Sequence, residues 1–319
     1  MLIVDIHTHG IGGYDTRGAT PQDILSIAKI HGSLGVNAII PTIYSDSIEQ
    51  MRTEIAVVKE AMESQGSGVG VQGLPSGALA GGSGVRETSG HEACDLKPAT
   101  ILGVHLEGPF LNPARAGALD KNSFLPAKLS ACKQLLEGFS DVVKIITVAP
   151  ELDGAPDLIR SIVDTGIIAS MGHSNATYSE AEAGFNAGAK GITHIFNAMR
   201  GIHHREPGIA GFGLVNPHVY VEVITDPFHL HPKTIELIFG MKKPEKIIIV
   251  SDSVKAAQTG ATTRSITDSA GNLLGGSMTI TESAKYLIGL GFEKGIVEQC
   301  VGANPVKYLT NESKSVSLS

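Results

Sequence analysis

The chain has 319 residues, of which 42% are hydrophobic and 18% are charged, and its formal net charge is −7. This length and composition are typical of a globular enzyme with one large core. The acidic balance argues against nucleic acid or an anionic membrane as a partner. The sequence has no apolar run of membrane-spanning length and no secretory leader pattern. Together with the three distant cysteines, Cys94, Cys132 and Cys300, this predicts a cytoplasmic protein.

Short apolar runs rich in Val and Ile alternate with helical patterns along the chain. Such runs are typical of parallel strands that are covered on both faces. Thr20 and Pro21 predict the start of a helix over Pro21–Leu34, and Thr177 precedes a helix over Ser179–Ala187. Eight strand–helix repeats predict a single (β/α)8 TIM barrel of the α/β class. The expected strands are Leu2–Asp5, Val36–Ile40, Ile101–Leu106, Val143–Val148, Ile167–Met171, Gly191–His194, Val219–Thr225 and Lys246–Val250.

The stretch Gln65–Thr100 interrupts this alternation, because it is dense in Gly and Ser and has little apolar periodicity. We interpret it as a flexible insertion at about residues 65–100. A phosphate-binding glycine loop is disfavoured, since the stretch has no leading strand and no GK[ST] ending.

The segment after the eighth strand is expected to add small elements to the barrel. Thr259–Ser277 predicts a loop or hairpin around Gly271, and helices follow near Thr281–Leu290 and Phe292–Val301, with a last turn near Asn304–Leu309. We expect the barrel to occupy residues 1–311 and residues 312–319 to form a frayed tail.

Polar, metal-ligating side chains lie at or just beyond the ends of five of these strands. Imidazole nitrogens and a carboxylate at separate strand ends can converge on a divalent cation at the mouth of a barrel. A remaining carboxylate can move protons for a water molecule that the cation activates. The candidates are His7, His9, Glu107, His173, His194 and Asp252.

Other polar residues near these strands have a simpler interpretation. Asp5, His7 and His9 are spaced two residues apart in the first strand. Their side chains are therefore expected on one face of that strand. His105 is interpreted as a packing or supporting histidine, and His203, His204, His218 and His231 as loop or surface residues.

Seven motifs in chain order carry a resemblance to a known family. The chain resembles the N-acetylglucosamine-6-phosphate deacetylases of the amidohydrolase superfamily over nearly its whole length. The fourth expected strand ends without the lysine that bridges two metals in some other amidohydrolases. The motifs are DIHTHG, HLEGPFLNPARAGA, GHSNATY, THIFNAM, HHREPG, DPFHLHP and VSDS.

The resemblance implies roles for individual residues. Glu107, His173 and His194 would hold the main divalent metal, His7 and His9 would hold or complete a second site, and Asp252 would be the general base and acid. The resemblance implies one or two ions, with zinc preferred and iron or manganese as alternatives. A further set would bind the amino sugar phosphate: Asn197, the backbone of Ala198, Arg205 and His229. In the family the arginine can come from a neighbouring subunit, which implies a homodimer.

The sequence departs from the family pattern in three places. Leu119 stands where relatives carry a polar residue that touches the substrate, and Pro227 replaces a usual glycine. The family's small β-sandwich is also not expected here. Because of these departures, the sequence does not decide between a gluco-configured and a galacto-configured substrate. Two other functions remain: hydrolysis of another N-acyl amine, and binding of a sugar phosphate without turnover.

Overall fold

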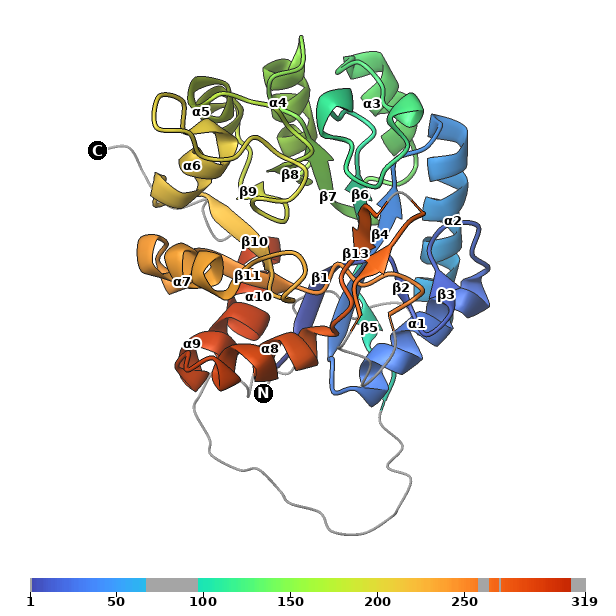
Figure 1. The fold of residues 1–319 in the computed structure, drawn as a ribbon. Helices are drawn as coiled ribbons and strands as arrows, with labels where there is room; N and C mark the ends of the chain where they lie inside the picture. The colour runs from blue at the N-terminus through green and yellow to red at the C-terminus, as the bar shows by residue number, and fades with distance from the viewer. Residues whose placement is uncertain (1, 67–96, 258–263, 270, 311–319) are drawn as a thin grey trace, which may run out of the picture.

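The computed structural model describes residues 2–66, 97–257, 264–269 and 271–310, drawn in colour in Figure 1. Three expected features lie wholly or partly outside these residues: most of the Gly/Ser-rich insertion, residues 259–263 and 270 of the loop or hairpin, and the tail. No helix among the described residues is both long and apolar enough to cross a membrane.

The described chain folds around a parallel barrel sheet, seen along its axis in Figure 1. Neighbouring strands pair in parallel along the series, and β5 (Thr100–Ile101) adds to β4 at its starting end. The barrel order is β1 (Val4–Thr8), β4 (Ala38–Tyr44), β6 (Val104–Glu107), β7 (Val143–Val148), β8 (Ile168–Met171), β9 (Gly191–Ile192), β10 (Tyr220–Ile224) and β11 (Ile247–Val250).

Backbone hydrogen bonds close the seam between the first and last strands of the barrel. The amide of Asp252 donates to the carbonyl of His7 at 2.9 Å, and the amide of His9 donates to the carbonyl of Ser253 at 2.8 Å. A parallel bridge also joins Thr8 to Ser253. The seam is therefore held by the same short segments that carry candidate site residues.

Helices surround the strands in Figure 1, and three of them begin with a capping box. In each box the threonine hydroxyl accepts a hydrogen bond from the backbone amide of the third helical residue. The acidic side chain of that residue accepts one from the backbone amide of the threonine. Two amides that would otherwise lack a partner are thereby satisfied. The caps are Thr20, Thr177 and Thr279. The α-helices are α1 (Pro21–Ser33), α2 (Ile48–Ser64), α3 (Leu129–Leu136), α4 (Ala155–Asp164), α5 (Tyr178–Asn186), α6 (Gly208–Val215), α7 (Pro232–Met241), α8 (Ile280–Gly289), α9 (Lys294–Glu298) and α10 (Asn304–Thr310).

The shorter elements lie in the connecting segments. A π-helical turn, η6 (Gln299–Ala303), joins α9 to α10. Two antiparallel hairpins are formed by β2 (Gly10–Ile11) with β3 (Tyr14–Asp15) and by β12 (Ile266–Thr267) with β13 (Leu273–Gly275). The 3-10 turns are η3 (Pro113–Arg115), η4 (Lys121–Ser123) and η5 (Pro244–Lys246).

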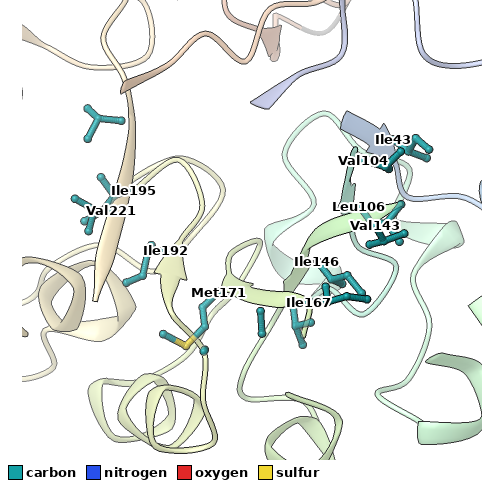
Figure 2. Packing of buried hydrophobic residues seen from close by; sticks show 14 of the residues in the cluster. Ile43, Val104, Leu106, Val143, Ile146, Ile167, Met171, Ile192, Ile195 and Val221 are labelled. Carbon is teal, nitrogen blue, oxygen red and sulfur yellow. The ribbon is translucent and has the colours of Figure 1, made fainter. Parts of the chain in front are cut away.

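Apolar side chains pack on both faces of the sheet. One cluster joins the outward side chains of the strands to the helices, as Ile146 of β7 and Ile159 of α4 illustrate. Figure 2 shows part of this layer along β4, β6, β7, β8 and β10. Alternate strand residues, such as Ile145 and Ile248, form a smaller cluster with Tyr308. Burying one such isoleucine contributes roughly 1.5–3 kcal/mol, so the two clusters hold the strand ends in place.

The expected (β/α)8 barrel is confirmed, with corrections at the strand ends. The first strand is Val4–Thr8 rather than Leu2–Asp5, and the second extends to Tyr44. The expected third strand is divided into β5 and β6, and β9 ends at Ile192, before His194. The expected helix at Phe292–Val301 is α9 followed by the π turn. Outside the barrel sheet, the described residues form the two small hairpins and no β-sandwich.

The two ends of the stretch Gln65–Thr100 lie next to each other at one point of the barrel. Gln65, directly after α2, donates its amide to the carbonyl of Ala99 at 3.0 Å and accepts from the amide of Ile101 at 3.0 Å. These contacts lie where β5 begins, at the end of the barrel away from the carboxyl ends of the strands. The described residues on either side of residues 67–96 therefore meet away from the candidate site.

His31 in α1 provides a test of the buried packing against β1. Its side chain is fully buried with Nε2 at 3.3 Å from the Thr8 hydroxyl, and burial lowers the pKa of His31 to about 4. The unfolded chain therefore binds more protons than the folded one between this pH and about 6.5, and stability falls as the pH falls through that range. In the wild type, titration of His31 should lower the free energy of unfolding by about 1 kcal/mol for each pH unit of this range. We expect His31→Gln to remove this contribution. Urea unfolding of both proteins across this range measures the difference, and parallel pH profiles would contradict it.

Candidate metal-dependent active site

The six candidate residues occupy equivalent places at the mouth of the barrel. Glu107 is the last residue of β6, whereas His173, His194 and Asp252 each lie two positions beyond the end of β8, β9 and β11. His7 lies within β1 and His9 directly follows Thr8, the last residue of that strand. Parallel strands end at the same rim of the barrel, so side chains from distant parts of the sequence meet there.

The backbone adopts an unfavourable conformation at three of these residues. His173, His194 and Asp252 have φ angles of 46°, 31° and 48°, in the left-handed region that residues other than glycine seldom adopt. Each such residue costs of order 1–3 kcal/mol, which the surrounding structure must offset. The sharp turn after each strand directs the side chain over the mouth of the barrel, so this strain is concentrated at the candidate site.

Two groups of three side chains form the centre of the site. In the first group, Nε2 of His173 and Nε2 of His194 each lie 3.0 Å from Oε1 of Glu107 and 3.2 Å from each other. The second group contains His7, His9 and Asp252, and the ligand atoms within each group lie within 4.8 Å of one another. Oε2 of Glu107 lies 3.2 Å from Nε2 of His9, so the two groups adjoin.

Charge is balanced within this cluster by opposed buried groups. Burial opposes ionisation of Glu107, but the neighbouring imidazoles, led by His173, hold the pKa of its carboxyl well below its usual range. Burial likewise acts against the charge of Asp252, and His7 and His9 lower the pKa of this carboxyl. For His9 the carboxylates of Asp252 and Glu107 outweigh burial and raise its pKa to about 9. Two carboxylates are thus anionic at neutral pH.

The donor set fits a divalent cation. Nε2 of His173 and Nε2 of His194 point at each other and at one carboxylate oxygen, an arrangement that a cation between them would satisfy for all three atoms. Nε2 of His7 is buried and makes no hydrogen bond of good geometry to any of the described residues, although Asp252 Oδ1 lies at 3.3 Å. Nitrogen and carboxylate ligands of this kind suit zinc, iron or manganese.

Backbone carbonyls orient two of the imidazoles. Nδ1 of His173 lies 3.0 Å from the carbonyl of Arg115, and Nδ1 of His9 lies 3.0 Å from the carbonyl of Thr42. If these nitrogens donate, the Nε2 lone pairs face the centre of the site, as metal ligation requires.

A cavity of about 600 Å³ opens above the cluster. Asn197, Ala198 and His229, three of the expected substrate-binding residues, line it. Nδ1 of His229 lies 3.0 Å from both carboxylate oxygens of Asp226, which fixes the direction of the ring. Leu119 and the β12–β13 hairpin form further parts of the wall.

Arg205, the fourth expected substrate-binding residue, is exposed and lies outside the cavity lining. Its loop is tied to the start of α5, where Glu206 accepts hydrogen bonds from the amides of Tyr178 and Gly208 at 2.8 and 3.0 Å. The lysine and arginine side chains that line the cavity are Arg17 and Lys255. Within a single chain, the structure therefore does not bring Arg205 to the other site residues.

Several residues that are not among the candidates expected from the sequence also shape the site. Tyr44 stacks on His9 with ring centroids 3.8 Å apart, and the central carbon of the Arg17 guanidinium lies 4.5 Å from the centroid of the Tyr44 ring. Glu151 accepts from the side chains of Asn112 and Ser174 at 2.8 and 2.7 Å and so joins the loops that follow β6 and β8. Glu151 lies three residues beyond the end of β7, and a carboxylate shortly after a buried strand is a signal that could have identified it.

Asp5 and His105 lie beneath the cluster and are not part of it. Oδ1 of Asp5 accepts from the amides of His7 and Ser251 at 3.3 Å each, across the β1–β11 seam. A register shift between Asp5 and Thr8 breaks the simple alternation expected for this strand. His105 contacts the Thr147 hydroxyl at 2.8 Å and the Ile6 carbonyl at 3.2 Å, consistent with its expected supporting role.

A (β/α)8 barrel with imidazoles and carboxylates gathered at the strand ends defines the class of metal-dependent hydrolases. Searches with family models gave no match to the chain. Comparison with curated proteins gave the N-acetylglucosamine-6-phosphate deacetylase of Bacillus subtilis, 31% identical over 97% of this chain and 69% of the relative. The chain belongs to the N-acetylglucosamine-6-phosphate deacetylase family.

Two further comparisons extend this result. The N-acetyl-D-glucosamine-6-phosphate deacetylase of Mycobacterium smegmatis has a similar structure, with a TM-score of 0.80 and 25% identity over 97% of this chain and 78% of that chain. An N-acetylgalactosamine-6-phosphate deacetylase of Escherichia coli O157:H7 is 29% identical over 80% of this chain and 59% of the relative. Relatives named for both sugar configurations therefore match the chain.

Proposed function

We propose that the protein hydrolyses the acetamide of N-acetylglucosamine-6-phosphate, giving glucosamine-6-phosphate and acetate. The observation that carries this proposal is the meeting of Glu107, His173 and His194 with His7, His9 and Asp252 at the barrel mouth of a chain from this family. The test is release of acetate and free amine by the purified protein after loading with zinc, iron or manganese. Absence of amine release with every metal would overturn the proposal.

Asp252 is the proposed general base and acid. Its carboxylate is anionic because His7 and His9 lower its pKa, and it borders the cavity. It can accept a proton from the attacking water and then donate that proton to the departing amine. A bound divalent cation would supply positive charge that lowers the pKa of this water and polarises the acetyl carbonyl. His229, whose ring is held by Asp226, lines the cavity and is placed to contact the substrate.

We propose that the cation is held by Glu107, His173 and His194, with His7 and His9 holding or completing a second position. Zinc is the preferred ion on the donor set, with iron and manganese as alternatives. Metal analysis of the purified protein identifies the ion and counts the ions per chain.

The anionic group of the substrate is assigned to Asn197, the backbone of Ala198 and Arg205. Because Arg205 is exposed on its own chain, we propose that it completes the cavity of a partner subunit in a homodimer. Arg17 and Lys255 at the cavity wall are the alternative cations within one chain. The planar guanidinium of arginine can donate two hydrogen bonds to a phosphate at once.

Arg205→Ala is expected to lower kcat/KM for the phosphorylated sugar at least tenfold, because a charge-assisted hydrogen bond contributes about 1.5–3 kcal/mol. Activity on the unphosphorylated sugar should change little. Steady-state kinetics with both substrates measure the effect, and Arg17→Ala is the matched comparison. If kcat/KM for the phosphorylated sugar falls only in Arg17→Ala, then Arg17 and not Arg205 contacts the phosphate. Equal wild-type rates on the two sugars would contradict phosphate recognition.

Two alternatives have specific support. Leu119 lines the cavity where relatives carry a polar residue, which favours a different N-acetylhexosamine phosphate or another N-acyl amine as substrate. Running the amine-release assay with gluco and galacto substrates in parallel decides between the sugars. The second alternative, a barrel that binds sugar phosphate without turnover, predicts binding but no amine release. We also propose a cytoplasmic location, which agrees with the free, buried thiols of Cys132 and Cys300.

A further inference from the structure

A buried glutamate lies behind the metal-facing imidazole of His7. Glu222 is the third residue of β10 and only 1% exposed, and its Oε2 lies 3.2 Å from Nδ1 of His7. Its other oxygen, Oε1, has no hydrogen-bond partner among the described residues. The carboxylate therefore makes its one side-chain hydrogen bond, within the described parts of the chain, to His7.

This contact distinguishes His7 from the other three imidazoles of the site. His9 and His173 direct Nδ1 to neutral backbone carbonyls, and Nδ1 of His194 has no partner among the described atoms. Only His7, of these four, has a carboxylate behind the ring. On the opposite side, Nε2 of His7 lies 3.3 Å from Asp252 and 3.6 Å from Glu107.

The chemistry of a buried carboxylate explains what this arrangement does. A carboxylate without a compensating positive charge is costly in a protein interior. A carboxylate that accepts a hydrogen bond from one ring nitrogen fixes the tautomer, leaves a lone pair on the other nitrogen, and makes that nitrogen a stronger ligand. A cation bound at Nε2 of His7 would place its charge one imidazole away from Glu222.

We propose that Glu222 is a positioning residue that strengthens divalent-cation binding at the position formed by His7, His9 and Asp252. It acts through His7 and makes no contact with the substrate cavity, whose lining does not include it. This inference rests on the proposed metal-dependent function, and it assigns one of the two metal positions a carboxylate–imidazole pair that the other lacks.

The test is a titration of the metal-free protein with a divalent cation. Binding is monitored by calorimetry and, with cobalt as the cation, by visible absorption. His7→Asn defines which part of the binding depends on His7. Glu222→Gln keeps an acceptor oxygen but removes the charge, and Glu222→Leu removes both. We expect the His7-dependent affinity to fall about tenfold in Glu222→Gln and up to about 100-fold in Glu222→Leu.

Glu54→Gln is the matched control, because Glu54 is also buried, at 4% exposure, and accepts hydrogen bonds from Gly18 and Gln50, neither of which is a candidate metal ligand. Its cation affinity should equal that of the wild type. Thermal unfolding with and without metal separates folding from binding: whatever the melting temperatures without metal, Glu222→Gln should gain less from added metal than the wild type. If Glu222→Leu does not fold, Glu222→Gln alone decides.

Two results would overturn the inference. One is an unchanged His7-dependent affinity in Glu222→Gln, and the other is identical cation binding by His7→Asn and the wild type. Both are measured without substrate, so they are independent of whether the loaded wild type releases amine from the acetylated sugar.

Discussion

Asp252→Asn is expected to lower kcat by about 10²–10⁴-fold, the usual contribution of a positioned general acid–base group. The amide has nearly the same shape as the carboxylate but cannot accept the proton of the attacking water. The left-handed backbone at Asp252, with φ 48°, is tolerated by asparagine better than by most residues, so the turn after β11 should persist. Substrate binding should remain, with kcat and not KM carrying most of the loss.

The measurement is steady-state kinetics at saturating metal, with metal content determined on the same samples. Asp157→Asn, at an exposed carboxylate in α4, is the control for handling and concentration. Near wild-type kcat in a metal-loaded Asp252→Asn protein would remove Asp252 from the proton-transfer role.

Glu107→Gln is expected to lose metal first and activity as a consequence. Glu107 is the carboxylate shared by His173, His194 and His9, and its charge balances the positive charge collected at the site. Removing one partner of a buried charged contact costs about 2–5 kcal/mol of binding free energy, which corresponds to at least about 30-fold in affinity for the cation.

Elemental analysis after dialysis should therefore show a metal-poor Glu107→Gln protein, whereas Asp252→Asn should keep the ion held by Glu107, His173 and His194, although both proteins are slow. Activity of Glu107→Gln should recover in part when the metal concentration is raised, whereas Asp252→Asn should not respond. A Glu107→Gln protein that keeps its full metal content would exclude Glu107 as a ligand.

The location of the site was predictable because ionisable side chains at the ends of buried strands are costly unless a cation or another partner compensates them. Glu107, His173, His194 and Asp252 each follow a run of Val, Ile or other apolar residues, and parallel strands must end together at one rim. The strand bounds were less accurate, since β1 contains polar residues up to Thr8 that a search for apolar runs does not include.

Other features depend on contacts that a single sequence does not encode locally. Glu222 occurs in a strand, Tyr-Val-Glu-Val-Ile, whose alternation resembles an ordinary half-exposed strand, and only the closed barrel reveals its contact with His7. The register shift in β1 arises from pairing with β4. Arg205 illustrates a further limit, because its proposed partner belongs to a second chain.

The seam between β1 and β11 has a consequence for how the protein is made. His7 lies in the first strand of the barrel in chain order and His9 directly follows it, whereas Asp252 and Ser253, which pair with them, follow the last one. Contacts between such distant residues form slowly, because a long loop must close before they contribute. An amino-terminal fragment that stops before β11 thus lacks both the seam and the proton-transfer residue. The complete set of candidate ligands is therefore assembled only when the segment after β11 has paired with β1.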